Sequence, residues 1–159
     1  MMNVNFIAMG KLKESFYREA CAEYQKRLGA FARVTVKEPT PEDLPQNPSP
    51  AQIEKALEKA AVWIRDSAKT GYKIALCVEG NPLSSEQLAQ KLETLGTSGV
   101  STVNFIVGSS FGLAESLKSE CDLRLSMSPM TFPHSLARVM LFEQVYRAFS
   151  ILGNSKYHK

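Results

Sequence analysis

Short apolar runs alternate along the chain with longer segments in which apolar residues recur every three to four positions. Five runs have the length and composition of β-strands, at residues 3–9, 34–38, 72–78, 102–107 and 123–126. Helical spacing is found at residues 14–28, 50–68 and 133–152, in a segment that opens at Ser84 and in a short segment after Gly112. Strands that alternate with helices predict an α/β fold with a mainly parallel sheet and helices on both faces.

Two of the predicted helices begin with a capping-box pattern, in which a serine is followed three residues later by a glutamine. Ser49 with Gln52 fits this pattern, and so does Ser84 with Gln87. Five of the eight prolines fall within residues 39–50, which predicts a stiff connection before the second helix.

The last predicted helix is apolar on all sides. From Leu136 to Leu152, 12 of 17 residues are apolar, and the polar ones do not share one face. A helix of this kind must be covered all round, and a chain of this size has little room to cover its last element. A symmetric homodimer would supply the second cover. The alternative is a helix inserted beneath loops of the same chain.

The composition is that of a globular protein, with 44% hydrophobic and 22% charged residues. The length of 159 residues predicts a single domain, residues 1–159. The longest apolar stretch is much shorter than a membrane span requires, and the first residues lack the basic region of a secretory signal. Cys21, Cys77 and Cys121 have no CxxC spacing, so we expect free, reduced cysteines in a cytoplasmic protein that does not bind membranes.

Basic residues are concentrated towards the two ends of the chain. Residues 1–38 hold seven cations and four anions, and residues 133–159 hold four cations and one anion, whereas residues 39–132 have a net charge of −3. If the two ends converge in space, they would neutralise phosphates of a nucleic acid. The alternative is an ordinary solvated surface.

Several familiar chemistries lack their motifs. The chain has no GxGxxG and no GxxxxGK[ST], which argues against dinucleotide redox chemistry and nucleotide hydrolysis. The two histidines lie 24 residues apart without a cysteine cluster, so we expect no metal site.

Three predicted strands end in or near glycine, at Gly10, Gly80 and Gly108, and a polar loop covers residues 126–134. In open α/β sheets, ligands bind beyond the carboxyl ends of the strands, and glycine lets a ligand approach the backbone closely. Backbone N–H and C=O groups suit a flat, neutral heterocycle such as adenine. The alternative interpretation is three ordinary turns.

Five stretches of the chain resemble one known family. They are AMGKLK at residues 8–13, AEYQKRL at 22–28, LSSE with LA at 83–86 and 88–89, MTFPH at 130–134, and EQVYRAF at 143–149 with the terminal YHK at 157–159. From end to end, the chain resembles the bacterial large-subunit ribosomal RNA pseudouridine N3-methyltransferases, which are minimal members of the SPOUT class.

The resemblance implies a C-terminal trefoil knot, an obligate homodimer, and S-adenosylmethionine as the methyl donor. It implies methylation of N3 of a pseudouridine in large-subunit ribosomal RNA. The assembled ribosome is the expected substrate, because a net charge of +3 is small for tight binding to free RNA. The cofactor contacts that the resemblance implies fall on Leu76, Gly108, Met127, Ser128, Pro129, Met130, Thr131 and Phe132.

Two positions depart from the family pattern. The family usually has a second glycine where this chain has Ser109, and a residue with an N–H where this chain has Pro129. A positive φ at position 109 would strain a serine, and Pro129 removes one backbone donor from the loop.

Methyl transfer to N3 requires loss of the imide proton, so a base, or a cation that favours the anion, would assist. His158 is the candidate proton acceptor, Tyr157 the residue that stacks on or orients the base, and Arg138 the group that stabilises an anion or holds a phosphate. Arg147 is a further candidate, with pairing to Glu143 as the alternative. Basic residues expected near the RNA are Lys11, Lys13, Arg18, Lys26, Arg27, Lys156 and Lys159.

Other interpretations stay open. One is a SPOUT-type methyltransferase of tRNA or of ribose hydroxyls, although no appended RNA-binding domain is evident. Another is a ribosome-associated binding protein without a cofactor, and a third is a small-molecule α/β enzyme. His134 is interpreted as the N-terminal residue of a helix rather than as a catalyst.

Overall fold

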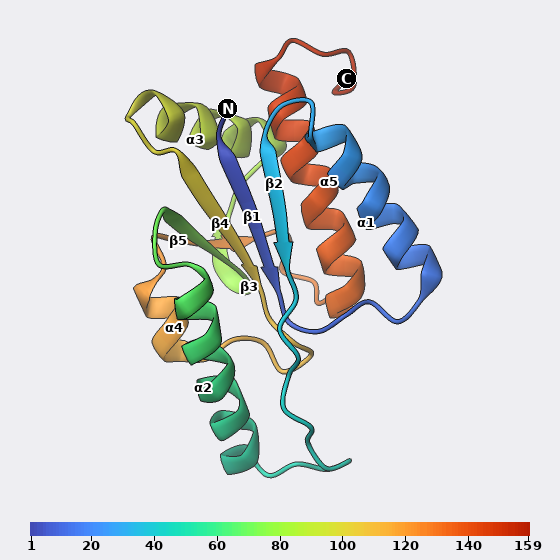
Figure 1. Cartoon of the computed structure of the whole chain (residues 1–159), viewed down its shortest axis with the longest axis vertical. Helices are drawn as coiled ribbons and strands as arrows, with labels where there is room; N and C mark the ends of the chain where they lie inside the picture. The colour runs from blue at the N-terminus through green and yellow to red at the C-terminus, as the bar shows by residue number, and fades with distance from the viewer.

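Five parallel strands form the centre of the structure, a computed structural model that describes residues 1–159 (Figure 1). The strands are β1 (Asn3–Ala8), β2 (Arg33–Lys37), β3 (Tyr72–Pro82), β4 (Thr102–Val107) and β5 (Leu123–Ser126). Their order across the sheet is β2-β1-β4-β3-β5, and each strand pairs with its neighbours in parallel. The predicted α/β fold with a parallel sheet is confirmed.

Five helices pack on the two faces of this sheet (Figure 1). They are α1 (Ser15–Leu28), α2 (Pro50–Ser67), α3 (Ser85–Thr97), α4 (Glu115–Glu120) and α5 (His134–Leu152). Helices α1, α3 and α5 cover one face, and α2 and α4 cover the other. Both predicted capping boxes are present, because Ser49 and Ser84 exchange hydrogen bonds with Gln52 and Gln87.

Side chains of β1 and β4 alternate between two hydrophobic cores. Phe6 faces the larger core beneath α1, α3 and α5, whereas the next residue, Ile7, faces the smaller core beneath α2 and α4. Burial on both faces explains why these strands are nearly continuous apolar runs. Asn104 of β4 is also fully buried, and it accepts a hydrogen bond from Asn5 (2.9 Å) and donates one to the Thr70 carbonyl (2.8 Å).

Strand β3 is longer than the sequence predicted. We expected it to end before Gly80, but it continues to Pro82, with an irregularity in its pairing to β5 between Leu76 and Asn81. A Cβ atom at Gly80 would lie 2.7 Å from the carbonyl carbon and oxygen of Arg124 in β5. The glycine is therefore required by the close approach of two backbones rather than by the end of a strand.

Helix α5 lies against the sheet and contacts both α1 and α3 (Figure 1). The ring of Phe142 stacks on that of Phe6 in β1, with centroids 4.0 Å apart. Leu141, Val145, Ala148 and Phe149 are buried as well, while the remaining apolar residues of the helix are half-buried. Much of the cover for this helix thus comes from helices of the same chain.

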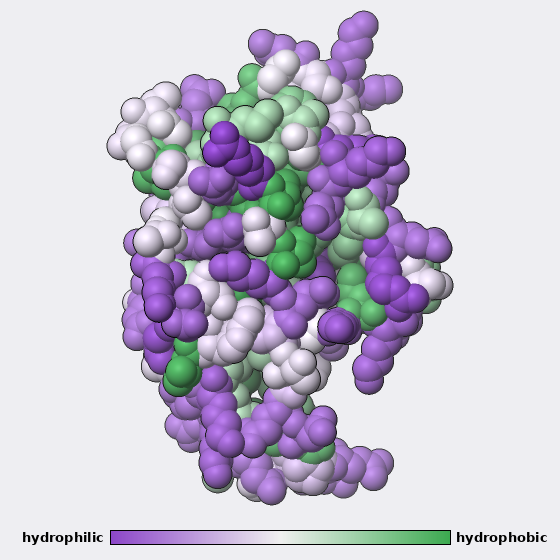
Figure 2. Space-filling model, in the orientation of Figure 1, coloured by the Kyte–Doolittle hydropathy of each residue, from purple (hydrophilic) through white to green (hydrophobic).

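The face of the molecule in Figure 2 is mostly hydrophilic, and hydrophobic residues form small, separate patches on it. None of the helices has both the length and the apolar character needed to cross a bilayer. All three cysteines are free, but only Cys21 is a core residue, since Cys77 and Cys121 are half-buried.

Replacing Phe142 with alanine tests the packing of α5. We expect Phe142→Ala to lower the free energy of unfolding by about 3–5 kcal/mol, because a buried ring is lost and a cavity remains. Phe16→Ala is the control, since Phe16 is 61% exposed, and it should change stability by less than about 0.5 kcal/mol. Chemical denaturation at a fixed protein concentration measures both, and similar values for the two variants would contradict this account of the core.

Candidate active site

A cavity of about 630 Å³ opens at the carboxyl ends of β3, β4 and β5. Its walls are the end of β3, the turn after β4, one residue of α4, and the loop that leads from β5 into α5. Half of the lining residues are hydrophobic. Ligands bind at this edge of open α/β sheets, and the volume and apolar character are typical of a small-molecule site.

The turn after β4 is held by contacts within its own backbone. The Gly112 N–H donates to the Ser109 carbonyl oxygen (2.9 Å), and the Phe111 N–H donates to the Ser109 hydroxyl (3.3 Å). A Cβ atom at Gly108 would overlap the Gly112 carbonyl group. Ser109 does not have a positive φ, so the serine that replaces the family's glycine carries no left-handed strain.

Two serine hydroxyls order the loop between β5 and α5. The Ser126 hydroxyl donates to the Ser128 carbonyl oxygen (3.1 Å), and the Ser128 hydroxyl accepts from the Met130 N–H (3.0 Å). Pro129 lies between these bonds and does not line the cavity. Its missing N–H therefore removes no donor from the cavity wall.

The structure brings together seven of the eight residues expected to contact the cofactor. The seven are Leu76, Gly108, Met127, Ser128, Met130, Thr131 and Phe132. Sequence analysis missed other lining residues, among them Glu79, Phe111 and Lys118. Glu79 directly follows the strand predicted at residues 72–78, and Phe111 lies in the turn after β4, which was the available signal. Lys118 comes from α4, and only the fold places it here.

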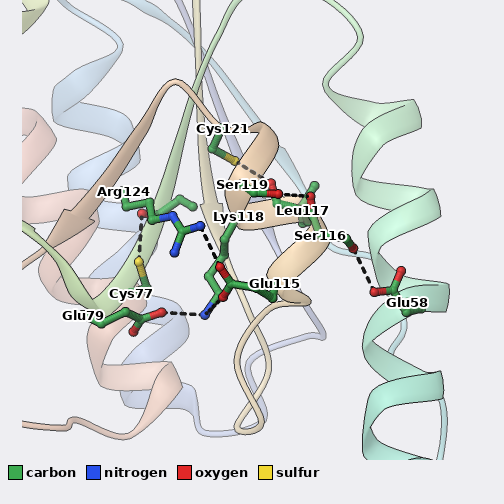
Figure 3. Close-up of polar contacts among 11 residues, drawn as sticks. Glu58, Cys77, Glu79, Glu115, Ser116, Leu117, Lys118, Ser119, Cys121 and Arg124 are labelled. Atoms are coloured by element: carbon green, nitrogen blue, oxygen red, sulfur yellow. Dashed lines mark hydrogen bonds and ion pairs between the residues drawn. The ribbon is translucent and has the colours of Figure 1, made fainter.

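An ion-pair network joins β3, α4 and β5 beside the cavity (Figure 3). The Lys118 ammonium lies 2.5 Å from a Glu79 carboxylate oxygen and 3.3 Å from one of Glu115, and Arg124 lies 2.7 Å from the other oxygen of Glu115. The hydrogen bond from Lys118 lowers the pKa of Glu79. In the cavity wall, this carboxylate is therefore ionised at neutral pH and balanced by the adjacent ammonium.

His134 begins α5 and lines the same cavity. Partial burial, and then the positive charge of Arg138, lower the pKa of His134. Its imidazole is therefore neutral at neutral pH and does not repel a positively charged ligand. The predicted position of His134 at a helix N-terminus is confirmed, but that interpretation missed its place in the cavity wall.

Arg138 does not line this cavity. Its Nη1 lies 2.7 Å from a Glu38 carboxylate oxygen, and its Nη2 donates to the carbonyl oxygens of Gly10 (2.7 Å) and Met9 (3.2 Å). Only 2% of the residue is exposed. These bonds tie the start of α5 to the ends of β1 and β2, so in this chain Arg138 positions the helix.

The C-terminal tail packs at the other end of α5. The ring of Tyr157 lies edge-on to that of Tyr146, with centroids 4.7 Å apart, and the Arg147 guanidinium lies 4.7 Å from the Tyr157 centroid. His158 has its Nδ1 at 3.1 Å from Arg147 and its Nε2 at 2.7 Å from Glu86. Because arginine can only donate, Nδ1 accepts this bond and Nε2 donates to Glu86.

Within one chain, the tail and the cavity are therefore far apart. Helix α5 has 19 residues, which at 1.5 Å per residue makes it about 28 Å long. The cavity borders its first residue, and the tail follows its last (Figure 1).

Burial raises the pKa of Tyr157 to about 12, so this phenol keeps its proton at neutral pH. Arg147 pairs with Glu143 at 2.6 Å, as the alternative interpretation of Arg147 predicted.

Comparison with known proteins identifies the family. A family model described as "Predicted SPOUT methyltransferase" matches residues 2–158. The chain belongs to the SPOUT methyltransferase family. A protein from Leuconostoc mesenteroides named "Ribosomal RNA large subunit methyltransferase H" is 42% identical, and one of the same name from Bifidobacterium animalis is 44% identical. Both matches cover 99% of this chain and all of the relative.

Two solved structures share the fold. A probable methylase family protein from Haemophilus influenzae has a TM-score of 0.56 at 13% identity, over 99% of this chain and 70% of that one. A probable methyltransferase from Bordetella pertussis also has a TM-score of 0.56, at 16% identity, over 93% of this chain and 95% of that one.

SPOUT methyltransferases use S-adenosylmethionine, and this chain is a methyltransferase with that methyl donor. The residues around the cavity fit this molecule. The apolar walls can accept the flat adenine ring and the aliphatic part of the methionine chain of this donor. The neutral His134 and the balanced pair of Glu79 and Lys118 leave no excess positive charge to oppose a sulfonium ion.

Adding a methyl group at Gly108 tests whether the turn after β4 belongs to the site. We expect Gly108→Ala to weaken S-adenosylmethionine binding by about tenfold or more, roughly 1.4 kcal/mol, because the turn must move away from Gly112. Gly96→Ala in α3 is the control, since its added methyl makes only ordinary contact with Met2. Titration calorimetry measures both, and equal affinities would remove the turn from the site.

Proposed function

We propose that the protein transfers a methyl group to N3 of a pseudouridine in large-subunit ribosomal RNA, on the assembled ribosome in the cytoplasm. Relatives at 42% and 44% identity, matched over their full length, are named as large-subunit ribosomal RNA methyltransferases, which supports the RNA substrate. The observation that carries the proposal is the convergence of seven expected cofactor residues on one cavity.

The proposed reaction mainly requires that the methyl donor and the base are held in line. When bound, S-adenosylmethionine supplies a methyl group that its positively charged sulfur already activates. Leu76 and Met127 provide apolar walls, and the backbone around Gly108 and the loop 127–132 provides hydrogen-bonding groups at the strand ends. Holding two reactants in a productive geometry accounts for a large part of such rate enhancements.

The proposed reaction needs a second copy of the chain. In one copy, Tyr157 and His158 lie at the end of α5 opposite the cavity (Figure 1). A symmetric homodimer with antiparallel α5 helices would place the tail of one copy beside the cavity of the other. Half-buried apolar residues of α5, such as Val139 and Met140, are available for this contact. Tyr157 would then orient the base, and His158 would accept the imide proton after releasing Arg147.

We also infer that residues 1–159 form one domain whose C-terminal part is threaded as a trefoil knot. Residues 76–79 of β3 and the loops after β4 and β5 border the same cavity. The chain leaves β5 at one edge of the sheet and passes these loops before it returns as α5 (Figure 1). This path supports the threading that the family resemblance implies.

Mass spectrometry of ribosomal RNA tests the proposed function. RNA from cells that lack the gene should lose one N3-methylpseudouridine, and the restored gene should return it. Purified protein should methylate ribosomes from the deletion strain in the presence of S-adenosylmethionine. Failure to bind this donor at millimolar concentration would favour the non-catalytic binding protein instead.

Removing residues 157–159 tests the role of the tail. We expect methyl transfer to be lost while affinity for S-adenosylmethionine stays within about tenfold, because the tail does not line the cavity of its own chain. Single-turnover assays and calorimetry measure the two properties. Unchanged turnover would refute the role of the tail.

Mixed dimers test whether the tail acts across the subunit boundary. A chain without residues 157–159 has an intact cavity, and the Gly108→Ala chain has an intact tail. If the site combines two copies, co-expression of the two chains should restore activity at a donor concentration too low to fill the Gly108→Ala cavity, because one site per mixed dimer is complete. If the tail and the cavity of the same chain cooperate, the mixture should not gain activity. Two different affinity tags, one on each chain, verify that mixed dimers have formed.

A further inference from the structure

A second cavity, of about 430 Å³, lies on the same edge of the sheet, at the ends of β1 and β2. Its walls are the loop after β1, one face of α1, the end of β2 and a part of α5. The charged residues in these walls are the cations Lys11, Arg18 and Arg138 and the carboxylate Glu38. None of them lines the first cavity.

The charges of this cavity do not balance. Glu38 is paired with Arg138 at 2.7 Å. Lys11 and Arg18 take part in no salt bridge, even though Glu14 lies in the same stretch of chain. Two exposed cations therefore face a concave surface without a carboxylate of their own.

Arginine N–H groups in this cavity also lack acceptors. Arg18 is held in place by its Nη1, which donates to the carbonyl oxygens of Leu12 (3.1 Å) and Lys13 (2.5 Å), and its other N–H groups have no protein acceptor. The Nε of Arg138 is buried and has no acceptor either. The free N–H groups of Arg18 are exposed to solvent, so a phosphate can replace water there, because it offers several oxygens to arginine and lysine. The Arg138 Nε is shielded and does not reach such a ligand.

The two cavities are neighbours through α5. His134 and Ala137 line the first cavity, and the next residue, Arg138, lines the second. A polynucleotide with one nucleotide at the first cavity would continue its backbone along this edge. Two of the basic residues expected near RNA, Lys11 and Arg18, thus lie beside the methyl-donor cavity, whereas Lys156 and Lys159 belong to the distant tail.

We propose that the second cavity binds a backbone phosphate of the RNA next to the methylated nucleotide, with Lys11 and Arg18 as its principal ligands. The identity of the polyanion rests on the proposed function, whereas the anion site rests only on this cavity. Arg138 stays bound to Glu38, so the positive charge of the site comes from Lys11 and Arg18.

The double variant Lys11→Gln with Arg18→Gln tests this site. Each phosphate contact adds about 0.7–0.9 to the slope of log affinity against log salt concentration. We expect the variant to bind ribosomes about tenfold more weakly near 0.1 M salt, with a slope smaller by about one. The KM for ribosomes should rise, whereas kcat and the affinity for S-adenosylmethionine should stay unchanged.

Lys55→Gln with Lys69→Gln is the control, because it removes the same charge from exposed positions near α2. It should leave the slope unchanged. If both double variants lose the same affinity for ribosomes, the cause is general electrostatic attraction, and the phosphate site is refuted. Weaker binding of the Lys11 and Arg18 variant with an unchanged salt slope would refute it as well. A change in oligomeric state confined to the Lys11 and Arg18 variant would make the cavity a subunit contact instead.

Inorganic phosphate separates the two sources of the anion. At 10 mM it should compete with ribosomes for the unaltered protein and not for the double variant. If phosphate raises the melting temperature only of the unaltered protein while both proteins bind ribosomes equally, the cavity takes a free anion and the RNA assignment fails. If the proposed function is wrong, the unaltered protein will show no methyl transfer. That result is independent of the salt dependence of ribosome binding, which tests the second cavity.

Discussion

A buried guanidinium organises the end of the molecule where both cavities lie. Arg138 in α5 bonds to Glu38 after β2 and to the carbonyl groups of Met9 and Gly10 after β1. This ion pair tolerates little displacement, because the Arg138 guanidinium without Glu38 would be a buried, unpaired charge. The pair therefore determines where α5 begins, and with it the course of the loop that crosses the ends of β3 and β4.

The first cavity contains few groups that can move a proton. Glu79 is bound to Lys118, which leaves the neutral imidazole of His134 at the start of α5 as a group able to accept a proton. Most of what the cavity offers is apolar surface and backbone, which suits a reaction whose donor is already activated and whose main requirement is alignment. The reactive side chains of the tail, Tyr157 and His158, are gathered about one helix length away. With the roles that we propose for these two side chains, a single copy is incomplete, which gives the proposed dimer a chemical reason.

The sequence analysis was most accurate where structure depends on neighbours along the chain. The capping boxes at Ser49 and Ser84, and the bounds of β4 and β5, agree with the predictions. It was wrong at β3, where Gly80 was taken as the end of a strand. The glycine is needed because Arg124, 44 positions later in the sequence, passes against it in β5. No periodicity within β3 could indicate a strand that far along the chain.

The same distinction applies to the site. The sequence alone determined the alternation of strands and helices and the starts of the capped helices, because period and capping depend on adjacent residues. Its resemblance to a known family indicated seven of the residues that meet in the first cavity. Only the tertiary structure decided that Arg138 is engaged with Glu38, that Lys118 reaches the cavity, and that the tail lies at the opposite end of α5. Each of these depends on how helices pack across a sheet, where partners 39 to 100 positions apart meet through burial that no local pattern records.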